Sequence, residues 1–269
     1  MATVTIDQHQ PLDNRFGDEL YRWRTRRRLS QLDLATRAGT TQRYVSYVER
    51  GRSAPGRAMV IRLAESMELS LRERNGLLLA AGYAPIYPRT GLDDPALRSV
   101  RDALDSIVAG HEPYPAIIVG PYGDILGANS GMGLFALGAS PELLEPPVNG
   151  FRLALHPDGM AARIENLADW GEHVLAHLRL RAERTPDPSL DALIDELSAY
   201  LPRSRPGSDY LGFTVPLRLR SPAGELRLIT TLTSFATATD VTLAELHLEA
   251  FLPADEATAE ILQTRAWAH

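Results

Sequence analysis

The chain has 269 residues, of which 44% are hydrophobic and 23% are charged, a composition that is ordinary for a soluble globular protein. Its length suits two domains better than one. It contains no cysteine, which excludes disulfides and thiolate metal sites and fits a reducing cytoplasm. The sequence has no apolar run of about 18–20 residues, the length that spans a membrane, and its N-terminus lacks the basic and apolar regions of a signal peptide. We therefore expect a cytoplasmic protein that makes no membrane contact.

The net charge of −6 is distributed unevenly along the chain. Between Leu12 and Arg57 there are eleven arginines and five acidic residues, so this segment carries about +6 and the remainder about −12. A basic segment attached to an acidic remainder suits a protein in which one domain alone binds the phosphates of a nucleic acid.

The first part of the chain, residues 12–82, predicts five short helices in succession. The first of them covers about residues 18–28. Ser30, with Asp33 three positions later, predicts a capping box at the start of the second helix. Gly39 predicts the end of that helix, because the residue after a helix commonly adopts the left-handed conformation that glycine tolerates.

The third helix and the two that follow it are bounded by similar signals. Thr41 caps the third helix, and Gly51 ends it. Two more helices are predicted over about residues 56–67 and 70–80. Proline and glycine then interrupt the pattern, which predicts a linker over residues 84–93.

The remainder of the chain, residues 94–269, mixes helices with strands. The segments with the apolar pattern of strands are 116–119, 125–128, 212–220, 225–235 and 244–251. The segments with a helical pattern are 94–109, 166–184, 188–200 and the tail from about residue 255. The stretch between 130 and 150 is rich in glycine and proline and predicts at most one short helix. We expect one antiparallel sheet with helices packed against it.

The third helix carries polar side chains on one side. The residues spaced to pack between the second and third helices are Leu34, Ala35, Val45 and Val48. The residues left to face outward are Gln42, Arg43, Ser46 and Tyr47. Arg43 suits O6 and N7 of guanine, and Gln42 suits N6 and N7 of adenine. The two helices are therefore typical of a helix-turn-helix motif, which places its second helix in the major groove of double-stranded DNA.

Residues around this helix are placed to bind the DNA backbone. Gln31 begins the second helix, where a side chain and a helix terminus together suit a phosphate. Three arginines after the third helix suit phosphates without reading bases. With the residue that precedes the third helix included, the expected DNA-binding residues are Gln31, Thr41, Gln42, Arg43, Ser46, Tyr47, Arg50, Arg52 and Arg57.

The sequence AGTTQ at residues 38–42, followed by V..VE.G at 45–51, resembles the XRE/Cro family of phage and bacterial repressors. The resemblance implies that the polar residues at the start of the third helix touch bases, and that Arg24 and Glu49 form a structural ion pair. Two tyrosines of this helix replace the small polar residues often found there, which leaves the base preference open. The alternative, a helical domain with arginines that are simply solvated, conflicts with the agreement of caps, turn glycine, packing alanine and charge.

Motifs for catalysis in the C-terminal part are weak. Gly131–Ala136 resembles a dinucleotide fingerprint, but prolines interrupt any following βαβ unit. His173 and His177 have the spacing of zinc ligands but no third ligand. His156–Gly159 predicts a tight turn, and Ser130 does not lie in a nucleophile elbow. We expect no enzyme, no cofactor and no metal site, and we keep a nucleotide- or metal-dependent enzyme as a rival.

The order of elements in the C-terminal part is similar to that of a PAS-like sensor. More closely, it resembles the MmyB-type ligand-binding domain that follows XRE helices in actinobacterial regulators, over about residues 95–265. The segments that carry this resemblance are GDILGAN at 123–129, FRLALHPDGMAARIENLADW at 151–170 and DVTLAELHLEAFLPADEATAE at 240–260. The resemblance implies a pocket for a fatty acid or another small apolar molecule.

Such a pocket, between sheet and helices, is expected to be apolar with a few polar anchors. The apolar candidates are Ile117, Val119, Leu126, Met132, Phe135, Trp170, Phe213 and Phe235. The candidates for a polar anchor are Arg163, Asn166 and His173. Taken alone, each apolar candidate is better explained by an ordinary hydrophobic core, and only the resemblance of the domain favours a pocket.

The expected fold class is α+β, an all-α domain of five helices followed by a PAS-like antiparallel sheet with flanking helices. The expected divisions are a tail at 1–14, the helix-turn-helix domain at 15–83, a linker at 84–93 and the MmyB-like domain at 94–269. We expect a homodimeric transcription regulator whose operator binding responds to a small lipophilic effector, with the linker and the helix at 94–109 carrying the change. The alternative is that the C-terminal domain only oligomerises or docks other proteins.

Overall fold

The computed structural model describes residues 14–185, 187–202, 214–235, 237–265 and 267. Contacts divide the chain into two compact units. The N-terminal unit comprises Met1–Arg89 together with Ala238–Ala244, and the C-terminal unit comprises Thr90–Thr237 and Glu245–His269. None of the helices in the described part of the chain combines the length and the apolar character needed to cross a membrane.

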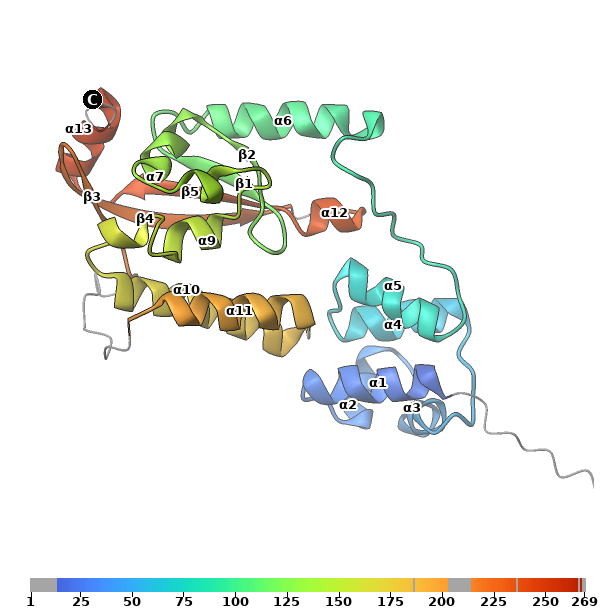
Figure 1. The fold of residues 1–269 in the computed structure, drawn as a ribbon. Helices are drawn as coiled ribbons and strands as arrows, with labels where there is room; N and C mark the ends of the chain where they lie inside the picture. The colour runs from blue at the N-terminus through green and yellow to red at the C-terminus, as the bar shows by residue number, and fades with distance from the viewer. Residues whose placement is uncertain (1–13, 186, 203–213, 236, 266, 268–269) are drawn as a thin grey trace, which may run out of the picture. The chain divides into compact units, whose positions relative to one another are not determined.

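The N-terminal unit is entirely helical (Figure 1). Its helices are α1 (Arg15–Arg26), α2 (Gln31–Arg37), α3 (Gln42–Glu49), α4 (Arg57–Ser66), α5 (Leu71–Ala80) and, from much later in the chain, α12 (Val241–Ala244). The five helices predicted at its start are confirmed, although α1 begins three residues earlier than expected. The short α12 lies where the third C-terminal strand was predicted to begin.

Local signals fix the ends of α2 and α3 as predicted. The Ser30 side chain accepts a hydrogen bond from the Asp33 backbone N–H, and the Asp33 side chain accepts one from the Ser30 backbone N–H. Gly39 has a φ of +60°, which glycine adopts at no steric cost. The Thr41 side chain accepts a hydrogen bond from the backbone N–H of Tyr44. These contacts hold the turn that sets α3 against α2.

The core of the N-terminal unit brings α1, α2 and α3 close together. Leu34, Ala35 and Val45 are almost fully buried, as the spacing predicted. Gly17 of α1 lies against the end of α3, where an added Cβ atom would be 2.6 Å from the carbonyl oxygen of Glu49. Only a residue without a side chain allows this approach. The position of α3 therefore depends on two small residues, one on each neighbouring helix.

The C-terminal unit contains one five-stranded sheet, and every strand pair is antiparallel. The strands are β1 (Ala116–Val119), β2 (Ile125–Ala128), β3 (Leu217–Ser221), β4 (Gly224–Ser234) and β5 (His247–Pro253), in the spatial order β2-β1-β5-β4-β3. The predicted fold class is confirmed. The predicted strand at 212–220 is shorter in the structure, and its first two residues lie outside the described residues.

Helices cover both faces of this sheet (Figure 1). The helices of the C-terminal unit are η1 (Pro95–Leu97), α6 (Arg98–Ala109), η2 (Ser130–Met132), α7 (Gly133–Ala136), α8 (Pro141–Leu144), α9 (Gly150–Leu155), η3 (Ala161–Arg163), α10 (Leu167–Arg184), α11 (Pro188–Tyr200) and α13 (Glu256–Thr264). Helix α6 packs on β1 and β2, while the α10–α11 pair lies on the opposite side of the sheet.

The segment from 130 to 150 was wrongly predicted to hold at most one short helix. It contains η2, α7 and α8. Pro141 begins α8, a position at which proline is favoured because its missing N–H has no partner to lose. Prolines in this segment therefore start a helix as well as interrupt one.

The two sheet faces have separate interiors. Ile117, Val119 and Phe251 belong to the large hydrophobic core that includes residues of α10 and α11. Ile118 and Leu248, their neighbours along β1 and β5, are also buried but lie outside that core. Successive residues of a strand point to opposite faces, so the odd-numbered residues of β1 and β5 face α10.

Candidate functional sites

The first candidate site is the exposed face of α3. Val45 and Val48 point into the core of the N-terminal unit. Arg43, Tyr47 and Arg50 follow at intervals of four and three residues, which places them on one face of the helix, away from that core. Gln42 is exposed because it stands at the start of the helix. This face carries the residues predicted to read bases, except for Ser46.

Ser46 was predicted to face outward, and the structure corrects this prediction. The residue is only 8% exposed. It lies one position after Val45 and two before Val48, so its short side chain falls at the border of the buried face.

The exposed face of α3 contains a side-chain pair that the sequence did not predict. Arg43 Nε donates a hydrogen bond of 3.0 Å to the hydroxyl oxygen of Tyr47. The guanidinium carbon lies 5.1 Å from the centre of the Tyr47 ring, within the range of a cation–π contact. No other hydrogen bond to the Arg43 guanidinium occurs within the described residues, so its terminal nitrogens are available. Tyr47 therefore restricts the Arg43 side chain and leaves its two terminal nitrogens, Nη1 and Nη2, able to donate hydrogen bonds.

A buried ion pair connects α1 to α3, as the XRE/Cro resemblance predicted. Arg24 Nε donates to Glu49 Oε1 over 2.6 Å, and a second bond of 3.1 Å joins its Nη2 to Oε2. Gln31 Nε2 donates to the same carboxylate over 2.6 Å. We expected the Gln31 side chain to bind a phosphate, but here it contributes to the network that holds α3.

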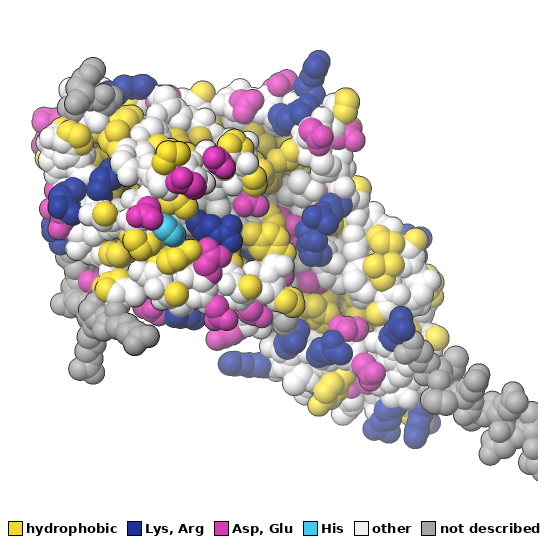
Figure 2. All heavy atoms as spheres, in the orientation of Figure 1, with side chains coloured by type: hydrophobic (Ala, Val, Ile, Leu, Met, Phe, Trp, Pro, Cys, Tyr) yellow, Lys and Arg dark blue, Asp and Glu magenta, His cyan; other side chains and the backbone are white. Residues whose placement is uncertain are grey.

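The remaining predicted DNA contacts are on the surface. Arg50, Arg52 and Arg57 are exposed, and none of them forms an ion pair with another described residue. Thr41 is exposed while its hydroxyl caps α3. Arginine side chains gather on the surface of this unit (Figure 2), which agrees with the local positive charge of the sequence.

The second candidate site is a cavity of about 350 Å³ in the C-terminal unit, between the sheet and α10. Of the predicted ligand-binding residues, those that line it are Ile117, Val119, Met132, Phe135, Trp170 and His173. Leu232 of β4 also lines the cavity and is 62% exposed, so the cavity opens toward solvent beside the second half of β4. Its lining is mostly apolar.

Three predicted apolar residues are not brought to the cavity or cannot be placed. Leu126 is 50% exposed and points away, because the cavity-lining residue of β2 is its neighbour Ile125. Phe235 follows the last residue of β4 and does not line the cavity. Phe213 lies outside the described residues.

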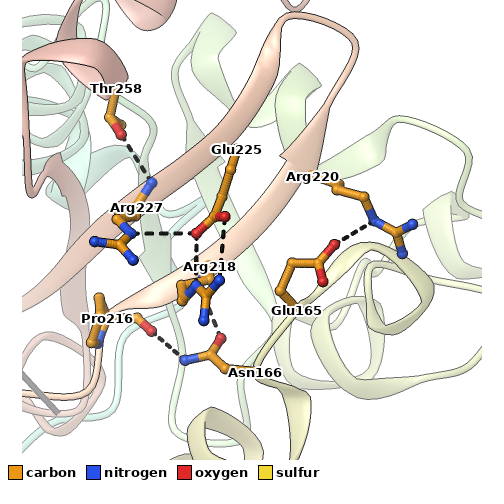
Figure 3. Close-up of polar contacts among 8 residues, drawn as sticks. All are labelled: Glu165, Asn166, Pro216, Arg218, Arg220, Glu225, Arg227 and Thr258. Atoms are coloured by element: carbon orange, nitrogen blue, oxygen red, sulfur yellow. Dashed lines mark hydrogen bonds and ion pairs between the residues drawn. The ribbon is translucent and has the colours of Figure 1, made fainter. Parts of the chain in front are cut away.

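Two predicted polar anchors instead hold the chain together. Arg163 Nη2 donates to the carbonyl oxygens of Leu134 and Phe135, at 3.0 and 3.1 Å. Asn166 donates to the carbonyl oxygen of Pro216 over 2.8 Å and accepts a bond from the backbone N–H of Arg218 over 3.1 Å (Figure 3).

Beside Asn166, an ion-pair network fastens the β3–β4 hairpin. Arg218 pairs with Glu225 at 2.6 Å, and Arg220 pairs with Glu165 at 2.7 Å (Figure 3). Arg227 donates through its backbone N–H to the hydroxyl of Thr258, which joins β4 to α13. Asn166 and these neighbours therefore serve the sheet, and neither Asn166 nor Arg163 lines the cavity.

The cavity has polar residues that sequence reasoning missed. On α10 they are His177 and Arg181, which continue the face of His173 at intervals of four. On β5 they are His247 and Glu249, which pair across the sheet with the inward-facing Val119 and Ile117 of β1. The residues of α10 could have been predicted from their helical spacing to His173. Those of β5 could not, because the sequence does not show which face of this strand points inward.

Titratable residues of the cavity lining have altered pKa values. Burial, and next the charge of Arg181, lower the pKa of the His247 imidazole, while Glu245 acts in the opposite direction. The last part of α10 therefore lies near the start of β5. Burial and then His177 lower the pKa of His173. Burial alone raises the pKa of Glu249 to about 7.

The histidines have a defined arrangement. His177 Nδ1 lies 3.0 Å from the carbonyl oxygen of His173, and because a carbonyl only accepts, this nitrogen carries the proton. His247 Nδ1 is buried without a hydrogen-bond partner. Among the described residues, no three side chains of histidine, aspartate or glutamate are grouped as metal ligands would be.

Two protein-family models match the chain, one over each part of it. The model of the MmyB-like transcription regulator ligand binding domain matches residues 100–264, and a helix-turn-helix model matches residues 20–74. The restriction-modification controller protein C.AhdI from Aeromonas hydrophila is 35% identical, over 22% of this chain and 91% of that chain, with a TM-score of 0.22. A comparison with curated proteins gave no match. The chain belongs to the family of MmyB-like transcription regulators, in which a helix-turn-helix DNA-binding domain here precedes the ligand-binding domain.

Proposed function

We propose that the chain binds a near-palindromic operator as a homodimer, and that a small apolar molecule in the cavity changes this binding. The observation that carries the proposal is the exposed face of α3, where Arg43, Tyr47 and Arg50 lie together next to Gln42. Helix-turn-helix dimers insert such a helix into each of two half-sites about one turn of DNA apart.

Arg43 is the residue that we assign to base recognition. Its terminal nitrogens suit a bidentate contact with guanine, which discriminates bases by about 1–3 kcal/mol. Its Nε already donates a hydrogen bond to Tyr47. The guanidinium group is therefore partly ordered before it binds, and it loses less conformational entropy on binding DNA. Arg50, Arg52 and Arg57 contribute phosphate contacts, which strengthen binding without selecting a sequence.

Selection from a random double-stranded DNA library tests this assignment. We expect the wild-type chain to enrich a sequence with two related half-sites. Arg43→Ala is expected to weaken binding to the enriched sequence about 5- to 150-fold and to relax one position in each half-site. Arg62→Ala, a change at an exposed residue of α4, serves as the control and should leave both unchanged. An Arg43→Ala variant with unaltered affinity and base preference contradicts the assignment.

The cavity supports a small lipophilic effector. Its volume of about 350 Å³ falls in the range of small-molecule sites, and Phe135, Trp170 and Phe251 supply apolar contact area. The apolar chain of a fatty-acid-like molecule fits this lining. Mass spectrometry of material extracted from the denatured protein, together with thermal shifts in a panel of lipids, checks the proposal. Absence of both a co-purified molecule and any thermal shift favours a C-terminal domain that only oligomerises or docks proteins.

A segment between two cavity strands supplies a route for coupling. Thr230 and Leu232 of β4 line the cavity, as does His247 of β5. Between these strands, α12 belongs to the N-terminal unit and contacts α5 there. Val241 is buried in this position, and its backbone N–H donates to the carbonyl oxygen of Pro88 over 2.8 Å. We propose that a ligand shifts the ends of β4 and β5 and so moves α12, alongside the linker and α6.

The size of such coupling has a fixed limit. A ligand shifts an equilibrium only by the difference between its affinities for the two states. Coupling free energies of about 1–3 kcal/mol are typical, equivalent to about 5- to 150-fold in operator affinity.

A further inference from the structure

Glu249 lies on the cavity face of the sheet, between two apolar residues of the neighbouring strands. Glu249 of β5 pairs with Ile117 of β1 on one side and with Leu232 of β4 on the other. All three line the cavity. The carboxyl group of Glu249 is therefore flanked by apolar side chains within its own sheet.

The Glu249 carboxyl group has no partner among the residues that the structure describes. Within the described residues Glu249 makes no hydrogen bond and no ion pair. His247, the next residue of β5 on the same face, has a ring nitrogen that is fully buried and has no hydrogen-bond partner in the described part of the chain. A buried polar group without a partner costs about 1–3 kcal/mol, so native proteins rarely leave one unless a bound molecule completes it.

The groups that face Glu249 from α10 do not compensate its charge. Burial, and next the charge of His177, lower the pKa of His173, which favours the neutral form of His173. The charge of Arg181 acts on His247, and burial is the sole cause of the altered Glu249 pKa. Arg181 supplies a cation to the cavity, but no charged residue of the described lining alters the pKa of Glu249. A plain hydrocarbon leaves Glu249 unsatisfied, and a carboxylate placed there is repelled by it.

We propose that the effector is an otherwise apolar molecule that donates a hydrogen bond to the Glu249 carboxyl from a hydroxyl or an amino group. This inference rests on the proposed function of the cavity and specifies the polar group of its ligand. Neither hydrogen-bond donor is present in a simple fatty acid in its ionised form.

The proposal predicts a dependence of binding on pH. Above pH 7 Glu249 is increasingly ionised, and an ionised carboxylate accepts a stronger hydrogen bond. Binding of an amine therefore strengthens between pH 6 and pH 8, while binding of a molecule that covers Glu249 without donating to it weakens. His173, His177, Arg181 and His247 also face the cavity, so the contribution of Glu249 is isolated by comparison with Glu249→Gln.

Three ligands with the same chain and different polar groups test the inference. We expect decylamine and decan-1-ol to bind the full-length chain more tightly than decanoate at pH 8, as measured by calorimetric titration. Glu249→Gln should weaken decylamine about 10- to 100-fold, the loss of a charge-assisted hydrogen bond, and decan-1-ol much less. Glu249→Leu should weaken both donors and leave decanoate unchanged or tighter. Glu172→Gln, which alters an exposed carboxylate of α10, is the matched control and should change nothing.

The outcomes separate this inference from the proposed function. Wild-type preference for decanoate, or a decylamine affinity that stays within about twofold in Glu249→Gln, overturns the inference while the cavity remains a binding site. Failure of all three ligands to bind the wild type overturns both. Because Glu249→Gln keeps the shape of the side chain, it provides a test even where Glu249→Leu unfolds, which thermal unfolding of each variant detects.

Discussion

Tyr47 has a role at the residue scale that differs from that of Arg43, which it contacts. Its hydroxyl accepts from Arg43 Nε, and its ring lies beneath the guanidinium. Tyr47→Phe keeps the ring and removes the acceptor. We expect this change to weaken binding to the selected operator by about 1 kcal/mol and to relax the base preference at the Arg43 position. Fluorescence anisotropy measures the affinity. An unchanged salt dependence would exclude loss of a phosphate contact.

Glu249 also affects stability in a way that depends on pH. Its pKa is about 7 in the folded chain against an ordinary value of 4.5, so the folded state binds this proton more tightly than the unfolded state. The associated stability is present below pH 4.5 and is lost as pH rises through 7. At pH 8 the loss is at most about 3 kcal/mol, since one pKa unit corresponds to about 1.4 kcal/mol.

Glu249→Gln removes the titrating group and so tests whether Glu249 lowers the free energy of unfolding as pH rises. Relative to the wild type, we expect the variant to gain stability as pH rises from 5 to 8, because only the wild type must bury a charge. Urea unfolding at several pH values measures the difference. A gap in unfolding free energy that stays constant with pH contradicts the assignment of the raised pKa to Glu249.

At the scale of elements, the close approach of α1 to α3 depends on Gly17. A Cβ atom there meets carbonyl oxygens of α3 at 2.6 and 2.7 Å, contacts that backbone must move to relieve. We expect Gly17→Ala to destabilise the N-terminal unit by about 1–3 kcal/mol, the usual cost of overpacking, and to weaken operator binding by displacing α3.

Gly76 provides a control of opposite sign. It lies within α5, and an added Cβ atom meets nothing within 4 Å. Gly76→Ala should stabilise the chain by about 0.5–1 kcal/mol, because alanine loses less conformational freedom than glycine in a helix. Urea unfolding measures the change in unfolding free energy of each variant, which should fall for Gly17→Ala and rise for Gly76→Ala. Equal changes in the two variants contradict the packing argument.

Sequence reasoning worked best where the determinants of an element are local. The capping box of Ser30 and Asp33 was predicted because two residues, three positions apart, specify it. Ser46 was misplaced because helical spacing locates the centre of a buried face better than its border. Glu249 and His247 were missed because the inward face of a strand depends on its partners, and those become known only from the sheet. α12 was not predicted because its four residues are too few to show a helical period, and a loop was predicted around Asp240 before the strand at 244–251.

For the whole molecule, the two units carry different parts of the function. The N-terminal unit holds the basic surface and α3, and the C-terminal unit holds the cavity. The family assignment followed from both segments of the sequence, since each carries its own motif. The polar chemistry of the cavity did not follow, because it is assembled from residues of α10 and β5 that lie more than sixty positions apart.

The central claim is that occupation of the cavity changes operator binding, and a thermodynamic cycle tests it directly. Operator affinity is measured with and without a saturating decyl ligand, and the affinity of that ligand is measured with and without saturating operator. We expect the ligand to change operator affinity by the same factor as the operator changes ligand affinity, because coupling between sites is reciprocal. The expected factor is about 5 to 150, as an increase or as a decrease. A ligand that binds in the cavity and leaves operator affinity unchanged contradicts the account.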